Sequence, residues 1–230
     1  MMDFTFGIIT GGNNDTMINE IIDSIENENI PNYEILIVGN CSIERKNTKI
    51  LNFDESLKKA WITKKKNLIT KESKFENIVY LHDYIKLNNG WYDGQIKSGS
   101  DFFIRMDKIV NSDGQRFRDW CIWPFNENDM DGIISHDCLI PYNITHLSKY
   151  MYISGSYWIA KKSVMEEFPL NESLCWGQGE DVIWSKQVRE RYNFNMNINS
   201  TVSIMKTGKE RVFNEPSQDK INILMDKERW

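Results

Sequence analysis

Two acidic clusters that lie far apart in the sequence have the residue types needed for metal binding or proton transfer. The first is His82-Asp83, which directly follows the apolar run Ile78–Leu81. A buried parallel strand has this composition, and open α/β sheets bind ligands beyond the carboxyl ends of their strands. A carboxylate beside an imidazole at that position can bind a divalent metal ion or the ribose of a nucleotide. From these residues alone, an ordinary polar strand end that leads into a loop is an equally good interpretation.

The second cluster is Glu180-Asp181, at the start of an expected helix. Carboxylates in a first helical turn are stabilised by the helix dipole, and this structural role explains the pair if it is considered alone. The preceding Trp176-Gly177-Gln178-Gly179 favours a functional role instead. Its two glycines allow a tight turn or a movement that closes a site, and Trp176 offers a flat apolar face of the kind that sugar rings contact.

The first forty residues predict a unit that places polar side chains at one edge of a sheet. Residues 3–10 and 33–38 have strand composition, and between them lies an amphipathic segment that Asp15 or Thr16 could cap. A βαβ unit pairs its strands in parallel, so Thr10-Gly11-Gly12 and Asn40 should share the same edge. Because Gly11-Gly12 lacks the third glycine of GxGxxG, the sequence argues against a dinucleotide-binding dehydrogenase.

The elements that follow are predicted from shorter patterns. Thr63 can cap a helix whose first turn carries Lys64-Lys65-Lys66; the lysines could grip a diphosphate, although a solvated charged face is the commoner explanation. Residues 88–94 read as a turn, 101–106 as a strand, 112–120 as a hairpin or ordered loop, and 214–230 as a terminal helix. Residues 151–162 form a strand pair or bulged strand, and Gly155 within them allows close backbone approach.

Composition restricts the function classes. A net charge of −5 argues against nucleic acid as the main partner. The four cysteines form no CxxC pair, which suits reduced thiols and a cytoplasmic location. We expect no signal peptide or membrane span. The spacing of His136-Asp137-Cys138 and His146 matches no zinc pattern, so we interpret these residues as loop or packing residues. The absence of a low-complexity linker predicts one domain over residues 1–230.

Taken in order, these motifs resemble the GT-A glycosyltransferases, in particular their family 2-like members. The nucleotide-binding first strand and turn are similar to Thr10-Gly11-Gly12, and the residue that reads the base falls on Asn40. The family's Lys-Asn helix looks like Lys66-Asn67, and its DXD motif falls on His82-Asp83-Tyr84. Its glycine-containing acceptor strand is similar to the segment around Gly155, and its Gly-Glu-Asp element looks like Gly179-Glu180-Asp181.

The resemblance implies an α/β fold of GT-A type, a single Rossmann-like nucleotide-binding domain with a mostly parallel central sheet flanked by helices. Residues 1–110 would form the nucleotide-sugar donor half, residues 111–210 the acceptor half and residues 211–230 a helical tail. It implies transfer of a sugar from a nucleotide diphosphate sugar, with UDP as the expected nucleotide, to a hydroxyl of a glycan or other acceptor. Transfer would be a single displacement with inversion.

The same resemblance assigns roles to individual residues. Asp181 would be the general base and Glu180 its neighbour in the site, with Gly155, Trp176 and Gly179 binding substrate. His82 and Asp83 would bind Mn²⁺ or Mg²⁺. Because His82 and Tyr84 replace the usual flanking carboxylates, metal dependence is less secure than with a full DXD motif. Without a metal, Lys64, Lys66 or Lys206 could neutralise the diphosphate.

Three other functions fit parts of this pattern. A nucleotidyltransferase would use a similar sheet, but its GxGxR-type signature after the first strand is missing. A metal-dependent hydrolase is weakened by the lack of a histidine pair at ligand spacing. A GT-A domain with weak or no catalytic activity, which binds only nucleotide or carbohydrate, would explain the depleted DXD motif. It is the main alternative.

Overall fold

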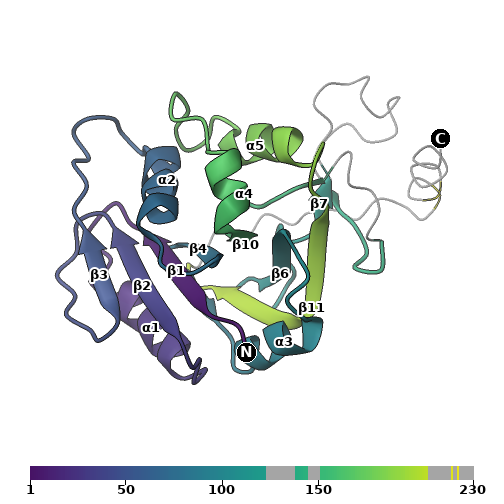
Figure 1. The fold of residues 1–230 in the computed structure, drawn as a ribbon, viewed down its shortest axis with the longest axis horizontal. Helices are drawn as coiled ribbons and strands as arrows, with labels where there is room; N and C mark the ends of the chain where they lie inside the picture. Colours follow the sequence, from purple (N-terminus) through teal and green to yellow (C-terminus); the bar gives the residue numbers. More distant parts are fainter. Residues whose placement is uncertain (123–137, 145–150, 207–218, 220–221, 223–230) are drawn as a thin grey trace.

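A computed structural model describes residues 1–122, 138–144, 151–206, 219 and 222. Its main feature is an eight-stranded sheet in the order β3-β2-β1-β4-β10-β6-β11-β5 (Figure 1). The strands, numbered along the chain, are β1 (Phe4–Ile9), β2 (Tyr33–Val38), β3 (Thr48–Leu51), β4 (Asn77–His82), β5 (Ile85–Leu87), β6 (Ile104–Val110), β10 (Tyr157–Lys161) and β11 (Phe194–Ile204). Only β10 and β5 run antiparallel to their neighbours, so the sheet is mostly parallel, as the sequence predicted.

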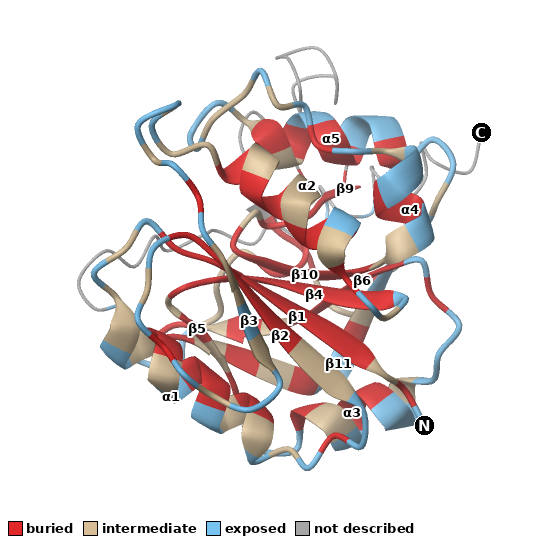
Figure 2. Cartoon of the chain, turned by 60° about the vertical axis from the view of Figure 1, so that its left-hand side comes forward, coloured by how far each residue is buried: buried red, intermediate tan, exposed pale blue. Residues whose placement is uncertain are grey.

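Helices cover both faces of this sheet, which explains why β1 and β4 are buried along their whole length. On one face lie α1 (Asp15–Glu26) and α3 (Trp91–Ser98); on the other lie α2 (Ile62–Glu72), α4 (Lys162–Glu167) and α5 (Glu180–Val188), as Figure 1 and Figure 2 show. A smaller sheet, in the order β8-β7-β9, contains β7 (Cys121–Ile122), β8 (Cys138–Leu139) and β9 (Met151–Tyr152). The described chain therefore has the predicted α/β class.

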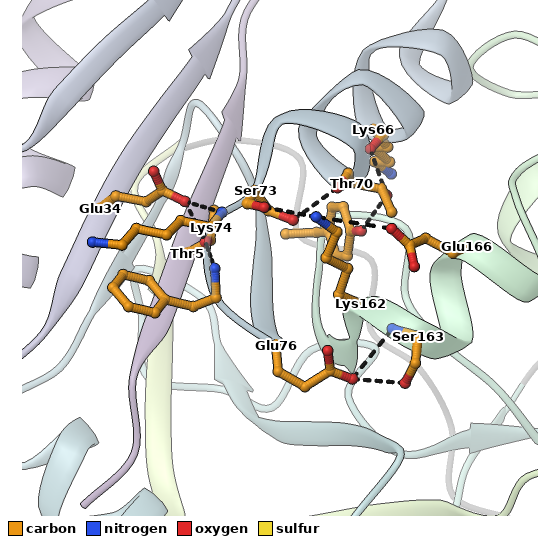
Figure 3. Close-up of polar contacts among 12 residues, drawn as sticks. Thr5, Glu34, Lys66, Thr70, Ser73, Lys74, Glu76, Lys162, Ser163 and Glu166 are labelled. Carbon is orange, nitrogen blue, oxygen red and sulfur yellow. Dashed lines mark hydrogen bonds and ion pairs between the residues drawn. The ribbon is translucent and has the colours of Figure 1, made fainter.

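The close approach of α2 to the sheet depends on Gly7 in β1. A Cβ atom at Gly7 would lie 2.4 Å from Cγ2 of Ile69, which is fully buried on α2. A hydrogen bond also links α2 to β4. Thr70 donates its hydroxyl to the carbonyl of Lys66 at 3.1 Å, and this hydroxyl also lies 2.7 Å from the hydroxyl of Tyr80 on β4 (Figure 3). The side chains of α2 are thereby fixed relative to the carboxyl ends of β1 and β4.

Strong patterns were predicted correctly, and weak ones were not. The strands at 4–9, 33–38 and 77–82 are present, and a helix begins at Glu180. The expected caps are wrong: Asp15 instead accepts the backbone N–H of Ser42, and Thr63 donates to the carbonyl of Leu174. These two side chains therefore make tertiary hydrogen bonds and do not cap the N-termini of their helices.

Other differences arise where packing overrides local sequence. The expected turn at 88–94 contains the start of α3, because the fully buried Trp91 anchors this helix to Asp107 of β6 at 2.8 Å. The expected strand at 101–106 is β6, displaced toward the C-terminus, and β3, β5 and β11 were not foreseen. Residues 112–120, in contrast, agree with the expected hairpin or ordered loop: they form turns and one isolated antiparallel bridge, Val110 to Arg116. The segment around Gly155 divides between two sheets, as β9 and β10.

Several expectations concern residues outside the described part of the chain. His136, Asp137 and His146 lie there, as does almost all of the expected terminal helix at 214–230. Among the described residues, none of the helices combines the length and the apolar character that crossing a bilayer requires.

Candidate active site

A pocket of about 570 Å³ opens beyond the carboxyl ends of β1 and β4. Parallel strands end together at this edge, where ligands of open α/β sheets bind. Its walls come from the two strand ends, the first turn of α2 and the loops that precede α2 and α5. The lining residues are Ile9, Thr10, Gly11, Gly12, Asn14, Glu55, Lys59, Ala60, Ile62, Lys65, His82, Asp83, Tyr84, Trp176 and Lys206. We call this cavity the donor pocket.

Asp83 is held in the donor pocket by only one of its two carboxylate oxygens. Oδ2 accepts a hydrogen bond from the hydroxyl of Thr10 at 2.8 Å and another from the amide of Asn14 at 2.7 Å. No described residue donates to Oδ1. The side chain is therefore fixed in position while one oxygen keeps its capacity to bind a ligand or a metal ion.

His82 also has unused bonding capacity. The residue is 9% exposed, and its buried Nε2 has no hydrogen-bond partner among the described residues. Burial lowers the pKa of His82 well below its usual value, and the positive charges of Lys66 and Lys206 lower it further. The imidazole is therefore neutral at physiological pH, which is the form that binds a metal ion.

The donor set of His82 and Asp83 fits a divalent cation that is completed by a diphosphate. Mg²⁺ in phosphate sites is commonly held by one or two carboxylates together with substrate oxygens and water, and Mn²⁺ also accepts imidazole. Within the described residues there is no group of three or more His, Cys, Asp or Glu side chains placed to hold an ion. The protein would thus supply few ligands.

Three lysines surround the same pocket and give it positive charge. Lys65 of α2 is 3% exposed and donates to the carbonyl of Thr10 at 2.6 Å and to the carboxylate of Glu55. Lys206, just after β11, places its ammonium 4.0 Å from the ring centre of Tyr84. Lys59 comes from the loop before α2. These charges come from separate segments of the chain and border the same pocket.

The three consecutive lysines of α2 point to different surroundings. Lys64 is partly exposed and pairs with Glu172 at 2.9 Å, whereas Lys65 lines the donor pocket. Lys66 belongs to the buried side of the helix and lines no part of the pocket. Sequence reasoning did not single out Lys65. Its signal is helical spacing, because Lys65 and Lys66 lie three and four residues after the buried Ile62.

The side chain of Lys66, on α2, is buried against Gly155 and against Trp158 of β10. It is 1% exposed, donates from Nζ to the carbonyl of Gly155 at 2.7 Å, and lies 4.4 Å from the ring centre of Trp158. Burial lowers the pKa of Lys66 to about 8, and the nearby charges of Glu180 and Asp181 oppose that shift. Lys66 is therefore a buried amine whose charged form is stabilised by Glu180 and Asp181 of α5.

Asp181 uses both carboxylate oxygens within the protein. Oδ2 accepts the N–H of Gly155 at 2.9 Å and Oδ1 accepts the N–H of Val182 at 2.9 Å, while the guanidinium of Arg118 lies 4.0 Å away. A Cβ atom at Gly155 would come within 2.9 Å of Oδ2, so a glycine is needed for this contact. Gly155 thus links Asp181 through its N–H and Lys66 through its carbonyl.

Glu180 differs from Asp181 although the two are adjacent. It is 6% exposed, and its carboxylate accepts no hydrogen bond from any other described residue. Burial raises the pKa of Glu180, and repulsion from Asp181 adds to the shift, while Lys66 and Arg118 oppose it. A buried carboxylate with a raised pKa and unused acceptor capacity is suited to receive a proton or a hydroxyl hydrogen bond.

The loop before α5 is bonded to the start of α2. Asn67 exchanges two hydrogen bonds with the backbone of Leu170, at 2.8 and 3.0 Å, and its amide also donates to Glu172 at 3.0 Å. Farther along, the N–H of Trp176 donates to the carbonyl of Ala60 at 3.1 Å. These bonds hold Trp176, which is 66% exposed, at the rim of the donor pocket.

The residues predicted from the sequence divide into two groups. One group lines the donor pocket and consists of Thr10, Gly11, Gly12, His82, Asp83, Trp176 and Lys206. The other group does not line it and consists of Asn40, Lys66, Asn67, Gly155, Gly179, Glu180 and Asp181. Asn40 is exposed beside the pocket, since a Cβ at Gly12 would lie 3.5 Å from its carbonyl oxygen.

The two acidic clusters meet through a short backbone segment. The N–H of His82 donates to the carbonyl of Ser156 at 3.1 Å, and the N–H of the preceding Gly155 donates to Asp181. Sequence reasoning missed Asn14, Glu55 and Lys59 as pocket residues. Most of these belong to loops whose positions depend on tertiary packing.

Comparison of sequences gives no match, either to a family model or to a curated protein. Comparison of folds gives several. S. aureus TarS 1-349 is 12% identical with a TM-score of 0.55, and the alignment covers 99% of this chain and 64% of that one. GalNAc-T7, solved with UDP, GalNAc and Mn²⁺, is 11% identical with a TM-score of 0.66, covering 100% of this chain and 50% of that one.

A further similar structure is S. aureus TarS 1-349 in complex with UDP-GlcNAc, at 13% identity and a TM-score of 0.54, covering 99% of this chain and 66% of that one. The chain thus spans about half to two thirds of the length of these structures. The mostly parallel eight-stranded sheet flanked by helices agrees with the fold comparison. The chain adopts a GT-A-like glycosyltransferase fold.

Proposed function

We propose that the chain is a glycosyltransferase that moves a sugar from a nucleotide diphosphate sugar to an acceptor hydroxyl. The observation that carries this proposal is the donor pocket, in which Asp83, with one oxygen available, faces a space bordered by Lys59, Lys65 and Lys206. A carboxylate suits a ribose or a metal ion, and clustered ammonium groups suit a diphosphate. Similar folds have been solved with UDP and with UDP-GlcNAc, which supports a uridine nucleotide.

Different protein groups would bind the different parts of the donor. Thr10, Gly11 and Gly12 form the wall at the end of β1, and Asn40 beside them is the proposed contact of the base. Asp83 and His82 would hold Mn²⁺ or Mg²⁺, and the ion when bound would act as a Lewis acid that stabilises the departing diphosphate. Lys65 and Lys206 supply positive charge to the same leaving group. Trp176 supplies an apolar face at the rim.

The transfer step is a single displacement with inversion. The acceptor oxygen forms a bond with the anomeric carbon, the bond between that carbon and the diphosphate oxygen breaks, and the electron pair leaves with the diphosphate. A carboxylate takes the hydroxyl proton, which contributes on the order of 10²–10⁴-fold to the rate. We assign this role to Asp181, with Glu180 contacting the substrate. Residues 1–110 and 111–210 are the proposed donor and acceptor halves.

A non-catalytic GT-A domain remains the second candidate, and one observation favours it. Both oxygens of Asp181 already accept backbone hydrogen bonds, so the proposed base is less available than in an open site. Such a domain would bind nucleotide or carbohydrate without turnover. Donor hydrolysis measured with and without manganese separates the two functions, because only the enzyme releases the free nucleotide.

A thermal-shift screen tests the proposed function directly. The purified chain is heated with uridine, guanosine and thymidine diphosphate sugars, each with Mn²⁺ and with EDTA. A ligand at about 100 times its Kd stabilises the folded state by about 2.7 kcal/mol, so a donor should raise the melting temperature measurably. We expect the largest shift with a uridine donor. A flat response to all three classes would contradict donor binding and, with it, the proposed enzyme.

A further inference from the structure

We propose that Lys66 is a positioning residue of the acceptor side, which holds Gly155 and supplies the counter-charge of Glu180-Asp181, whereas its neighbour Lys65 serves the donor diphosphate. The inference rests on the proposed function and makes it more specific. It gives two adjacent lysines different roles, and it departs from the donor-side role that the family resemblance and the sequence suggested for Lys66.

The contacts of Lys66 leave it little freedom to reach a donor. The residue is 1% exposed, and its ammonium donates to the carbonyl of Gly155 at 2.7 Å and lies against the ring of Trp158. It does not line the donor pocket. Moving it there would break that hydrogen bond and expose the stem of the side chain. Lys65, by contrast, already lines the pocket, next to Thr10 and Glu55.

Hydrogen bonds at the backbone of Gly155 link Lys66 to Asp181. The carbonyl of Gly155 accepts from Lys66, and its N–H donates to Oδ2 of Asp181 at 2.9 Å. One residue farther on, the carbonyl of Ser156 accepts the N–H of His82 at the end of β4. The lysine therefore fixes the short segment that lies between the donor pocket and the carboxylate pair.

Charge provides the second connection. The groups that act on Glu180 are Asp181, Lys66 and Arg118; burial and Asp181 raise the pKa of Glu180, and the two cations oppose this. Glu180 and Asp181 in turn are the charges that favour the protonated form of Lys66. Beyond this pair, Lys66 acts on His82, where Lys65 and Lys206 also contribute. Removing Lys66 should therefore raise the pKa of Glu180 further.

The experiment compares four variants of the full chain. Lys66→Met keeps the length of the buried stem without the charge, and Lys66→Arg restores a cation. Lys65→Met removes the pocket lysine, and Lys71→Met removes an exposed lysine of the same helix as a charge-matched control. Two quantities are measured for each: the pH profile of kcat/KM for transfer, and UDP affinity by calorimetry.

We expect Lys66→Met to move the acidic limb of the profile upward, because Glu180 then loses a cation that favours its charged form and keeps its proton to higher pH. Its UDP affinity should stay within about twofold of the parent. Lys65→Met should lose about tenfold in UDP affinity, roughly 1.4 kcal/mol, with the limb unmoved. Lys66→Arg should return the limb toward its original position, and Lys71→Met should change neither quantity.

The opposite pattern would overturn the inference. If Lys66→Met weakens UDP binding as much as Lys65→Met and leaves the limb in place, Lys66 is a donor ligand. This outcome differs from failure of the proposed function, in which the parent protein itself neither binds UDP nor transfers sugar.

A stability measurement tests the buried cation without any activity. Because the pKa of Lys66 is about 8 in the folded state and near 10.5 when exposed, the unfolded chain binds more protons between these values. The free energy of unfolding of the parent should therefore rise with pH from about 8 toward 10.5, relative to Lys66→Met. A constant difference between the two proteins across this range would contradict a buried, charged Lys66.

Discussion

The donor pocket and the Glu180-Asp181 pair lie beside each other, but their polar side chains differ in how fully they are hydrogen-bonded within the protein. In the pocket, Asp83 keeps one oxygen without a protein donor, and His82 has a buried nitrogen without a partner among the described residues. In the acidic pair, Asp181 is bonded at both oxygens and is faced by the guanidinium of Arg118. The donor side has bonding capacity reserved for a ligand, whereas Asp181 is already arranged by the protein.

The aromatic residues show the same contrast. Trp176 is 66% exposed at the pocket rim, where a ligand could contact it. Trp158 is fully buried behind the acidic pair, stacks on Tyr80 with ring centres 4.6 Å apart, and faces Lys66. The sequence predicted a sugar-contacting face at Trp176. The burial of the two tryptophans indicates that Trp176 is available for recognition and that Trp158 supports the lysine.

The largest expected effect tests which carboxylate is the base. Asp181→Asn should lower kcat by about 10²–10⁴-fold, because the proton acceptor is lost, while UDP affinity stays nearly unchanged. Glu180→Gln is the matched variant and should lose less. Initial rates with a saturating donor, together with calorimetry, measure both. If Glu180→Gln proves the more damaging change, the base is Glu180, and the bonding of Asp181 is structural.

An intermediate effect tests the reserved capacity of Asp83. Asp83→Ala should weaken nucleotide-sugar affinity in Mn²⁺ by about tenfold or more, since a metal or ribose contact is lost. With EDTA present, the difference between the variant and the parent should be smaller. Asp93→Ala, an exposed carboxylate of α3, is the control. Equal affinities of parent and Asp83→Ala in Mn²⁺ would remove Asp83 from the metal site.

The smallest expected effect concerns the bonds that fasten the loop of Trp176. Asn67→Ala removes hydrogen bonds to Leu170 and Glu172, so the free energy of unfolding should fall by about 1–2 kcal/mol. Asn52→Ala, at an exposed position, should leave it unchanged. Urea unfolding measures both. Should Asn67→Ala match its control in stability and instead lose UDP affinity, the residue binds nucleotide, as the family resemblance suggests.

The parts of the fold that sequence predicted are those with strong, local hydrophobic patterns. The runs that became β1, β2 and β4 are apolar because helices cover both of their faces, and this requirement is visible in the residues themselves. By contrast, β11 alternates asparagine with apolar residues and owes its place to pairing with β6 and β5. α3 contains a glycine at position 94 and is held by the burial of Trp91.

By itself, the sequence determined the α/β class and the two acidic clusters, because strand composition and a polar strand end are properties of contiguous residues. Only the tertiary structure decided what each side chain faces. Lys64, Lys65 and Lys66 are identical in type and adjacent in the chain, yet they meet a partly exposed carboxylate, an open pocket and a buried carbonyl. Successive residues of a helix point in different directions, and the surroundings in each direction come from distant segments.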